Sequence, residues 1–486
     1  MSRIIRYFLV WTAIFFWPLG YLCGSCNCLL ISLVLLWLNN IIFGFENISR
    51  RVVFLFFNFT FAVFLLSRPV ISALRGDVWW YFDLDHLLFA LYSMLVSLVF
   101  MFVGAIIAER MSRNKKQEYI PPVLTEYKSN LVKNLQIISA VIFVISMGFY
   151  LLMEAEKLLY VMQTSYLDYY SGFSSHMPYL IYSVSRLMPY SLCIFLATYP
   201  EKKKAFVVLV LYVISAVPSL LIGIRNQIVL NVLFAWIYYL IRDIYENKHK
   251  WFGRFERTAV AIAAPCAIVF LGAYNYIRAG EEAEVGGVLG LIADFFYKQG
   301  VTFDVLAIGH STIPHLPQRA FRNYTFGGFI DYITHGTLAQ KLFGAQSLGD
   351  GNNILQATLS NSFAHNMSYV ARGQDYLDGN GWGSSFLLEL YTDFGYIGLA
   401  VFSIVLGIIM IKMLDFARKG TFHFTLVLTS LTSLLFVPRA EATGWLSFII
   451  TAQFWVTVIL CWFLAGICTK RYSNPLLYAN RRKQYV

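Results

Sequence analysis

The chain has 486 residues, of which 58% are hydrophobic and only 13% are charged, and its formal net charge is +11. Because soluble domains carry about 25% charged residues, this composition excludes an ordinary soluble protein and indicates a membrane protein. The positive balance does not indicate nucleic-acid binding. Lys and Arg recur in alternate loops, where membrane topology and anionic inner-leaflet lipid account for them.

Apolar runs long enough to cross the hydrocarbon core as helices, at roughly 20 residues each, recur along the chain. They lack the alternation of a lipid-facing barrel strand, so the predicted fold class is an all-α polytopic membrane protein. The first run begins "MSRIIRY" without a small-x-small cleavage site after it, which predicts a retained helix rather than a signal peptide. In chain order, the twelve predicted helices span 4–22, 26–45, 52–67, 86–108, 131–153, 177–199, 203–222, 226–246, 258–276, 387–412, 422–438 and 446–467.

The loops alternate between strongly basic segments and segments with few cations. The basic ones include "PEKKK", "RDIYENKHKWFGRFER" and the C-terminal "KRYSNPLLYANRRKQYV". Because Lys and Arg accumulate in cytoplasmic loops, both termini are predicted to be cytoplasmic. The short outer turns then hold only Arg68, Arg75, Lys157, Arg225 and Arg439.

This topology divides the chain into four parts. Residues 1–276 form transmembrane helices 1–9, 277–386 an extracytoplasmic loop, 387–468 helices 10–12, and 469–486 a basic cytoplasmic tail. The loop is too polar to span the membrane, and loops of this length without a role are uncommon. Short amphipathic segments joined by Gly and Asn turns predict a compact cap that rests on the membrane surface.

Two arginines interrupt the charge pattern in short outer turns. Arg225 lies in "LLIGIRNQIVL" and Arg439 in "FVPRAEATGW". A cation at membrane depth is costly unless it has a partner. The alternatives are snorkelling, an ion pair such as Arg439 with Glu441, or an anion shared by both arginines. Planar guanidinium groups bind phosphate oxygens in a bidentate way, so for the two together we favour a lipid phosphate or diphosphate.

Three segments resemble a known family. "LLIGIRNQIVL", "FVPRAEATGWLSFI" and "GNGWGSSFLLELYTDFGYIGLAVFSIVLG" are similar to segments of the Wzy-type O-antigen and capsular polysaccharide repeat-unit polymerases. The resemblance implies a GT-C-like membrane fold in the cytoplasmic membrane of a bacterium, with the active site on the outer face. It also implies transfer of a glycan from undecaprenyl pyrophosphate to the next lipid-linked unit, without a nucleotide sugar or cofactor. Expected partners are these lipid-linked oligosaccharides, membrane lipids, a chain-length regulator and a flippase.

Further residues are candidates for this chemistry. Departure of a diphosphate builds negative charge that preorganised cations stabilise, which makes Arg225 and Arg439 the first candidates and Arg278 the third. For Arg278, a helix-end cation favoured by the dipole is an equal alternative. The acceptor hydroxyl needs a proton acceptor within about 3 Å. The candidates are His365, whose "HN" pair is similar to that of O-antigen ligases, Glu389 and Asp393 on one helix face, and Glu441.

The stretch "DGNGWGSS", residues 378–385, ends at a predicted helix start. Ser384 and Ser385 there either present N–H groups to a phosphate or cap the helix. No metal-ligand array is visible, so metal independence is expected. Two other functions stay open: a ligase that moves finished glycan to another acceptor, and a lipid-linked oligosaccharide flippase.

Overall fold

The computed structural model describes residues 2–78, 82–113, 126–246, 250–279 and 287–472. All regular elements within these ranges are helices, which confirms the all-α fold class. Eleven of the described helical segments are long and apolar enough to cross a membrane. The segment predicted at 422–438 forms the shorter apolar helix Thr421–Leu434, which explains the difference from the predicted count of twelve.

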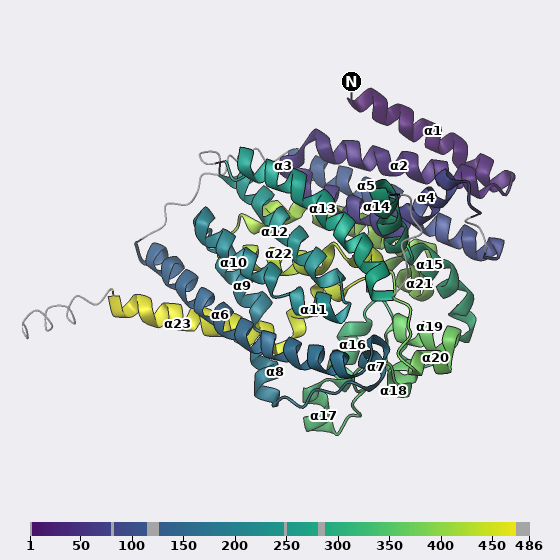
Figure 1. Ribbon diagram of the computed structural model, residues 1–486. Helices are drawn as coiled ribbons and strands as arrows, with labels where there is room; N and C mark the ends of the chain where they lie inside the picture. Colours follow the sequence, from purple (N-terminus) through teal and green to yellow (C-terminus); the bar gives the residue numbers. More distant parts are fainter. Residues whose placement is uncertain (1, 79–81, 114–125, 247–249, 280–286, 473–486) are drawn as a thin grey trace, which may run out of the picture.

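The helices are labelled in Figure 1. The membrane bundle comprises α1 (Ser2–Leu22), α2 (Cys26–Glu46), α3 (Ile48–Phe61), η1 (Ala62–Leu66), α4 (Ser67–Arg75), α5 (Leu84–Arg113), α6 (Glu126–Gln163), α8 (Tyr179–Ser185), α9 (Met188–Ala197), α10 (Lys202–Ile214), α11 (Val217–Ile222), α12 (Asn226–Tyr245), α13 (Arg254–Ala279), α21 (Phe386–Ala417), α22 (Thr421–Leu434) and α23 (Ala452–Tyr472). The remaining elements are α7 (Tyr166–Gly172), α14 (Gly287–Gln299), α15 (Thr302–Thr312), η2 (Ile313–His315), α16 (Gly327–His335), α17 (Thr337–Phe343), α18 (Ile354–Leu359), α19 (Phe363–Arg372), α20 (Gln374–Leu377), η3 (Val437–Arg439) and η4 (Gly444–Ile450).

The central contact of the bundle joins α5 to α21. A Cβ on Gly104 would collide with the backbone of Ile404, and one on Gly407 would collide with the backbone of Met101. Small residues at these positions let two membrane helices approach backbone to backbone, which increases their van der Waals contact. We call this closely packed helix pair the α5–α21 axis and use it as a reference for positions along the bundle.

The two helices of this axis run in the same direction. Near their starts the rings of Phe89 and Tyr391 lie 4.5 Å apart, and Gly104 meets Ile404 further along both helices. From Phe89 to Glu109, near the end of α5, the rise of an α-helix gives about 30 Å, the thickness of the hydrocarbon core. The start of α21 and the end of α5 thus belong to opposite membrane boundaries.

The helix predicted over 446–467 begins later than expected. Residues Gly444–Ile450 form a 3₁₀ segment, and Thr451 is extended before α23 begins at Ala452. The buried indole of Trp445 donates to the carbonyl of Ala442 at 3.0 Å, which holds this segment against the preceding turn. Hydrophobicity alone did not show this break, because both sides of it are apolar.

The segment between α13 and α21 folds into short helices, α14 to α20. Figure 1 shows α16 to α20 gathered with α7 at one side of the bundle. The first part of the segment is held to the bundle by an ion pair of 3.0 Å between Asp304 in α15 and Arg68 in α4. Gly300, between α14 and α15, leaves room for the backbone of Arg68. The placement of 277–386 outside the cell remains a prediction.

Candidate functional site

Arg439 ends the 3₁₀ segment η3, directly after the short helix α22. Its Nη1 donates to Gln299 at the end of α14, at 3.3 Å to the carbonyl and 3.4 Å to Oε1. Its guanidinium carbon lies 5.9 Å from the ring centre of Phe64. The described contacts of Arg439 are therefore with neutral groups, and the ion pair with Glu441 that the sequence left open does not form.

Arg225 is brought to Arg439 by the turn between α11 and α12. Gly223 ends α11 with φ of 109°, and Ile224 donates to the carbonyl of Ser219 at 2.8 Å. Positive φ at this helix end is readily adopted by glycine, so "GIRN" turns tightly and leaves Arg225 immediately before α12. The turn explains how a membrane helix pair can present a cation at its end.

The two guanidinium groups interact electrostatically across more than two hundred residues of sequence. The pKa of Arg439 is lowered to about 10, first by burial and then by the positive charge of Arg225, while Tyr166 opposes the shift. Like charges in a poorly solvated place raise the free energy of the charged state. The pair is therefore a position where an anion would lower the free energy of the protein.

Ser384 and Ser385 connect α21 to the turn that carries Arg439. The Ser385 hydroxyl caps α21, accepting from the Leu387 amide, and donates to the carbonyl of Pro438 at 2.9 Å. The Ser384 hydroxyl donates to Glu389 at 2.7 Å. Both serines are buried. Ser385 thus caps the helix, which is one of the two alternatives that the sequence left open, whereas Ser384 bonds to Glu389 and does not cap it.

Glu389 and Asp393 lie one turn apart on α21, as predicted, but hold different segments. Glu389 has no exposed surface and accepts from the amide of Ala442 at 2.8 Å, three residues after Arg439. Asp393 accepts from the amides of Tyr324 and Thr325 at 2.9 and 2.7 Å and from the Thr325 hydroxyl at 2.7 Å. α21 therefore positions both the arginine turn and the segment before α16.

Glu441 follows Arg439 by two residues, in the turn between η3 and η4. Burial raises the pKa of its carboxyl, and the nearby charge of Asp331 raises it further. The oxygen Oε2 of Glu441 would lie 3.1 Å from a Cβ on Gly328, at the start of α16. Glu441 thus faces α16 and forms, with Asp331 and Glu389, an acidic side to the site.

His365 lies in α19, away from the described contacts of both arginines. Its Nδ1 is 2.8 Å from the hydroxyl of Tyr376, and burial lowers its pKa. The adjacent Asn366 accepts from the Tyr324 hydroxyl at 3.0 Å, and the amide of Tyr324 binds Asp393. His365 is therefore linked to α21 through this segment and shares no described contact with Arg439.

Arg278 lies in the last turn of α13 by its backbone. Its side chain is outside the described residues, so its role as a third cation is still a prediction.

The sequence did not identify Gln299 or Tyr166 as neighbours of Arg439. Tyr166 begins α7, and Gly351 and Gly379 pack against this helix. A Cβ on Gly351 would collide with the carbonyl of Tyr170, and a Cβ on Gly379 would collide with the carbonyl of Leu167. Gly379 of the "DGNGWGSS" stretch thus allows close approach to α7.

These elements define a polytopic membrane protein with a cationic pair at one membrane boundary. A family model described as O-antigen polysaccharide polymerase Wzy matches residues 4–472, nearly the whole chain. The chain belongs to this family. It is an integral membrane protein of polysaccharide biosynthesis, with the repeat-unit polymerase activity that defines the family. No curated protein and no solved structure gives a significant match.

Proposed function

We propose that the protein polymerises oligosaccharide units linked to undecaprenyl pyrophosphate. The growing glycan passes from its carrier to a hydroxyl of the next lipid-linked unit, and undecaprenyl pyrophosphate leaves. The reaction takes place on the outer face of the cytoplasmic membrane. The proposal is supported by the family and by one observation, the electrostatic interaction of Arg225 with Arg439, each of which lies in a turn at the end of a membrane helix or of α22.

The arginine pair suits a diphosphate better than a single carboxylate. Two planar guanidinium groups can each bind two oxygens, and a diphosphate offers both charges and oxygens to satisfy them. During transfer the bond between the anomeric carbon and the diphosphate oxygen breaks, and negative charge grows on that oxygen. Cations fixed before the reaction stabilise this charge without reorganisation. Arg225 and Arg439 therefore serve the leaving group.

The hydroxyl that attacks must lose a proton as its new bond to the anomeric carbon forms. His365 is the proposed acceptor, because burial lowers its pKa and keeps the imidazole neutral near pH 7. The Tyr376 hydroxyl lies 3.4 Å from the carbonyl of Asn353. If it donates there, Nδ1–H of His365 donates to Tyr376, and Nε2 keeps a lone pair for the proton. Glu389, fully buried, positions the Arg439 turn in this scheme. Ser384, Ser385, Asp393 and Glu441 are proposed to support the substrate-binding surface around it.

Reconstitution tests this proposal directly. The purified full-length protein in lipid nanodiscs receives a synthetic undecaprenyl-pyrophosphate repeat unit, and the products are separated by size. We expect a ladder of polymers from the wild type and single units from Arg225→Ala and Arg439→Ala. Arg110→Ala is the control, because Arg110 is exposed near the end of α5, at the opposite end of the α5–α21 axis. A normal ladder from either site variant would remove that arginine from the mechanism, and no ladder from the wild type would favour a ligase or flippase.

A further inference from the structure

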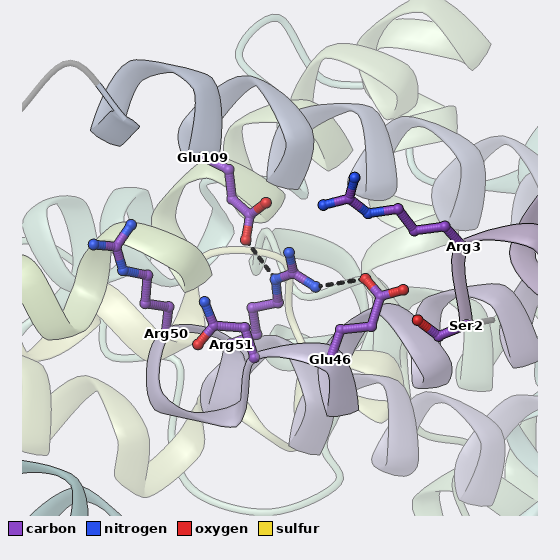
Figure 2. Close-up of a pocket in the computed structure, with 7 residues that line it drawn as sticks. Ser2, Arg3, Glu46, Arg50, Arg51 and Glu109 are labelled. Carbon is purple, nitrogen blue, oxygen red and sulfur yellow. Dashed lines mark hydrogen bonds and ion pairs between the residues drawn. The ribbon is translucent and has the colours of Figure 1, made fainter.

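A second arginine-rich site lies at the opposite end of the α5–α21 axis. A pocket of about 390 Å³ opens between the start of α1, the α2–α3 turn and the end of α5. Figure 2 shows its lining side chains, among which Arg3 extends toward Arg51 and Glu109. The lining residues are Ser2, Arg3, Glu46, Asn47, Arg50, Arg51 and Glu109.

One arginine of this pocket is fixed by the fold. Arg51 is buried and bonds to Glu109, to Glu46 at 3.2 Å and to the carbonyl of Phe43. Glu46 also pairs with Arg6 at 2.7 Å, from outside the pocket. The two acidic residues of the pocket are therefore already neutralised by Arg51 and Arg6.

The other two arginines leave the pocket with a positive charge. Arg3 and Arg50 are exposed, and the ion pairs given for the described residues of this pocket all involve Arg51 or Arg6. Arg3 and Arg50, which form no ion pair within the described residues, lie on opposite sides of Arg51 and Glu109 in this cavity (Figure 2). This is the arrangement that binds a phosphate ester through charge-assisted hydrogen bonds.

The pocket also borders the lipid. α1 is hardly covered by the rest of the protein, and Ile4, Phe8 and Trp11 are each at least 69% exposed, beginning one residue after Arg3. Their spacing places them on one face of the helix. A phosphate held by Arg3 and Arg50 could therefore continue into acyl chains along this face. Basic clusters at this boundary attract anionic lipid.

We propose that this pocket binds the phosphate of an anionic phospholipid of the leaflet opposite the polymerisation site. The predicted orientation makes that leaflet the cytoplasmic one. The pocket shares no residue with the proposed reaction site, so lipid binding here is independent of the proposed reaction. Lipid binding would fasten the poorly covered helix α1 to the α2–α3 turn and α5.

Thermal unfolding of the purified full-length protein tests the site. Phosphatidylglycerol and phosphatidylethanolamine are added in separate, equal titrations, and lipid retention is counted by native mass spectrometry. We expect phosphatidylglycerol to raise the Tm of the wild type more than phosphatidylethanolamine does. The double variant Arg3→Ala/Arg50→Ala should lose this preference, with an affinity for phosphatidylglycerol about tenfold weaker. It leaves the Arg51 ion pairs intact, so folding is preserved.

Arg110→Ala is the matched control, since Arg110 is exposed at the same end of α5 but does not line the pocket. It should behave as the wild type. In a separate experiment the protein receives sn-glycerol 3-phosphate or inorganic phosphate in place of lipid. If either compound raises the Tm of the wild type but not that of the double variant, the anion site is supported and its ligand is a free phosphate. Equal responses of the wild type and the double variant to phosphatidylglycerol, or no preference over phosphatidylethanolamine, would overturn the proposal.

Discussion

Arg51 and Arg439 are both drawn into the protein, at opposite ends of the α5–α21 axis, but their partners differ. Arg51 forms ion pairs with two carboxylates and donates to a backbone carbonyl, and its guanidinium carbon lies 3.5 Å from the ring centre of Phe43. Arg439 bonds to the neutral atoms of Gln299 and lies in the field of Arg225. A buried cation whose charge is met inside the chain serves the fold. A desolvated cation beside a second cation costs stability, and this cost is repaid when an anionic ligand binds.

The largest expected effect is on stability at the Arg51 end. Arg51→Ala leaves Glu109 without its cation at a partly buried position, and loss of one partner of such a pair costs about 3–5 kcal/mol. The expected result is a lower Tm in detergent and a smaller monodisperse fraction on gel filtration. Replacing both partners, as Arg51→Met/Glu109→Leu, should recover most of the loss. An Arg51→Ala variant as stable as the wild type would contradict the structural role given to this ion pair.

Arg439→Lys tests the other arginine of this comparison, which we expect to serve catalysis and not stability. An ammonium cannot reproduce the bidentate fork, so polymerisation should fall roughly 100-fold, equivalent to about 2.7 kcal/mol of transition-state stabilisation. The Tm should stay the same, because the substitution breaks no ion pair within the described residues. Rates of ladder formation and Tm are measured on the same preparations. A matching loss of Tm would show that Arg439 serves the fold in the way that Arg51 does.

The sequence predicted the fold class well and the site in part. Hydrophobic runs and loop charges are local signals, so the membrane helices and the positions of Arg225 and Arg439 in short turns between them could be predicted from the sequence. That these turns lie on the outer side stays a prediction. The partners of these residues are not local. Gln299 ends an amphipathic helix with no distinguishing pattern, and the polar bonds of Glu389 and Asp393 depend on which segments the fold brings to α21. The 3₁₀ segment before α23 was missed because it is as apolar as a membrane helix.

Asp393→Asn has a smaller expected effect. It tests whether Asp393 holds the segment of Tyr324 and Thr325, which precedes α16. Asp393→Asn keeps one acceptor oxygen but removes the negative charge, so the charge-assisted character of the bonds from Tyr324 and Thr325 is lost. Weakening of these bonds costs about 1–2 kcal/mol. We expect faster proteolysis between α15 and α16 with α21 still inserted, and a modest fall in polymerisation. Asp415→Asn, at the far end of α21, is the control. Equal protease sensitivity of the Asp393 variant and the control would show that these bonds do not fasten the segment.

The smallest expected effect is a pH dependence at His365. Burial lowers its pKa below the ordinary value of 6.5, so between these two values the unfolded chain binds a proton that the folded chain does not. Stability should therefore fall as pH drops below about 6.5 and be fully present above it. His365→Gln should flatten the curve of Tm against pH in that range. Tyr376→Phe should leave the slope in place, because burial rather than the hydrogen bond lowers the pKa. If His365→Gln kept the wild-type slope, the acid sensitivity would belong to another group, such as His310, whose pKa is also lowered by burial.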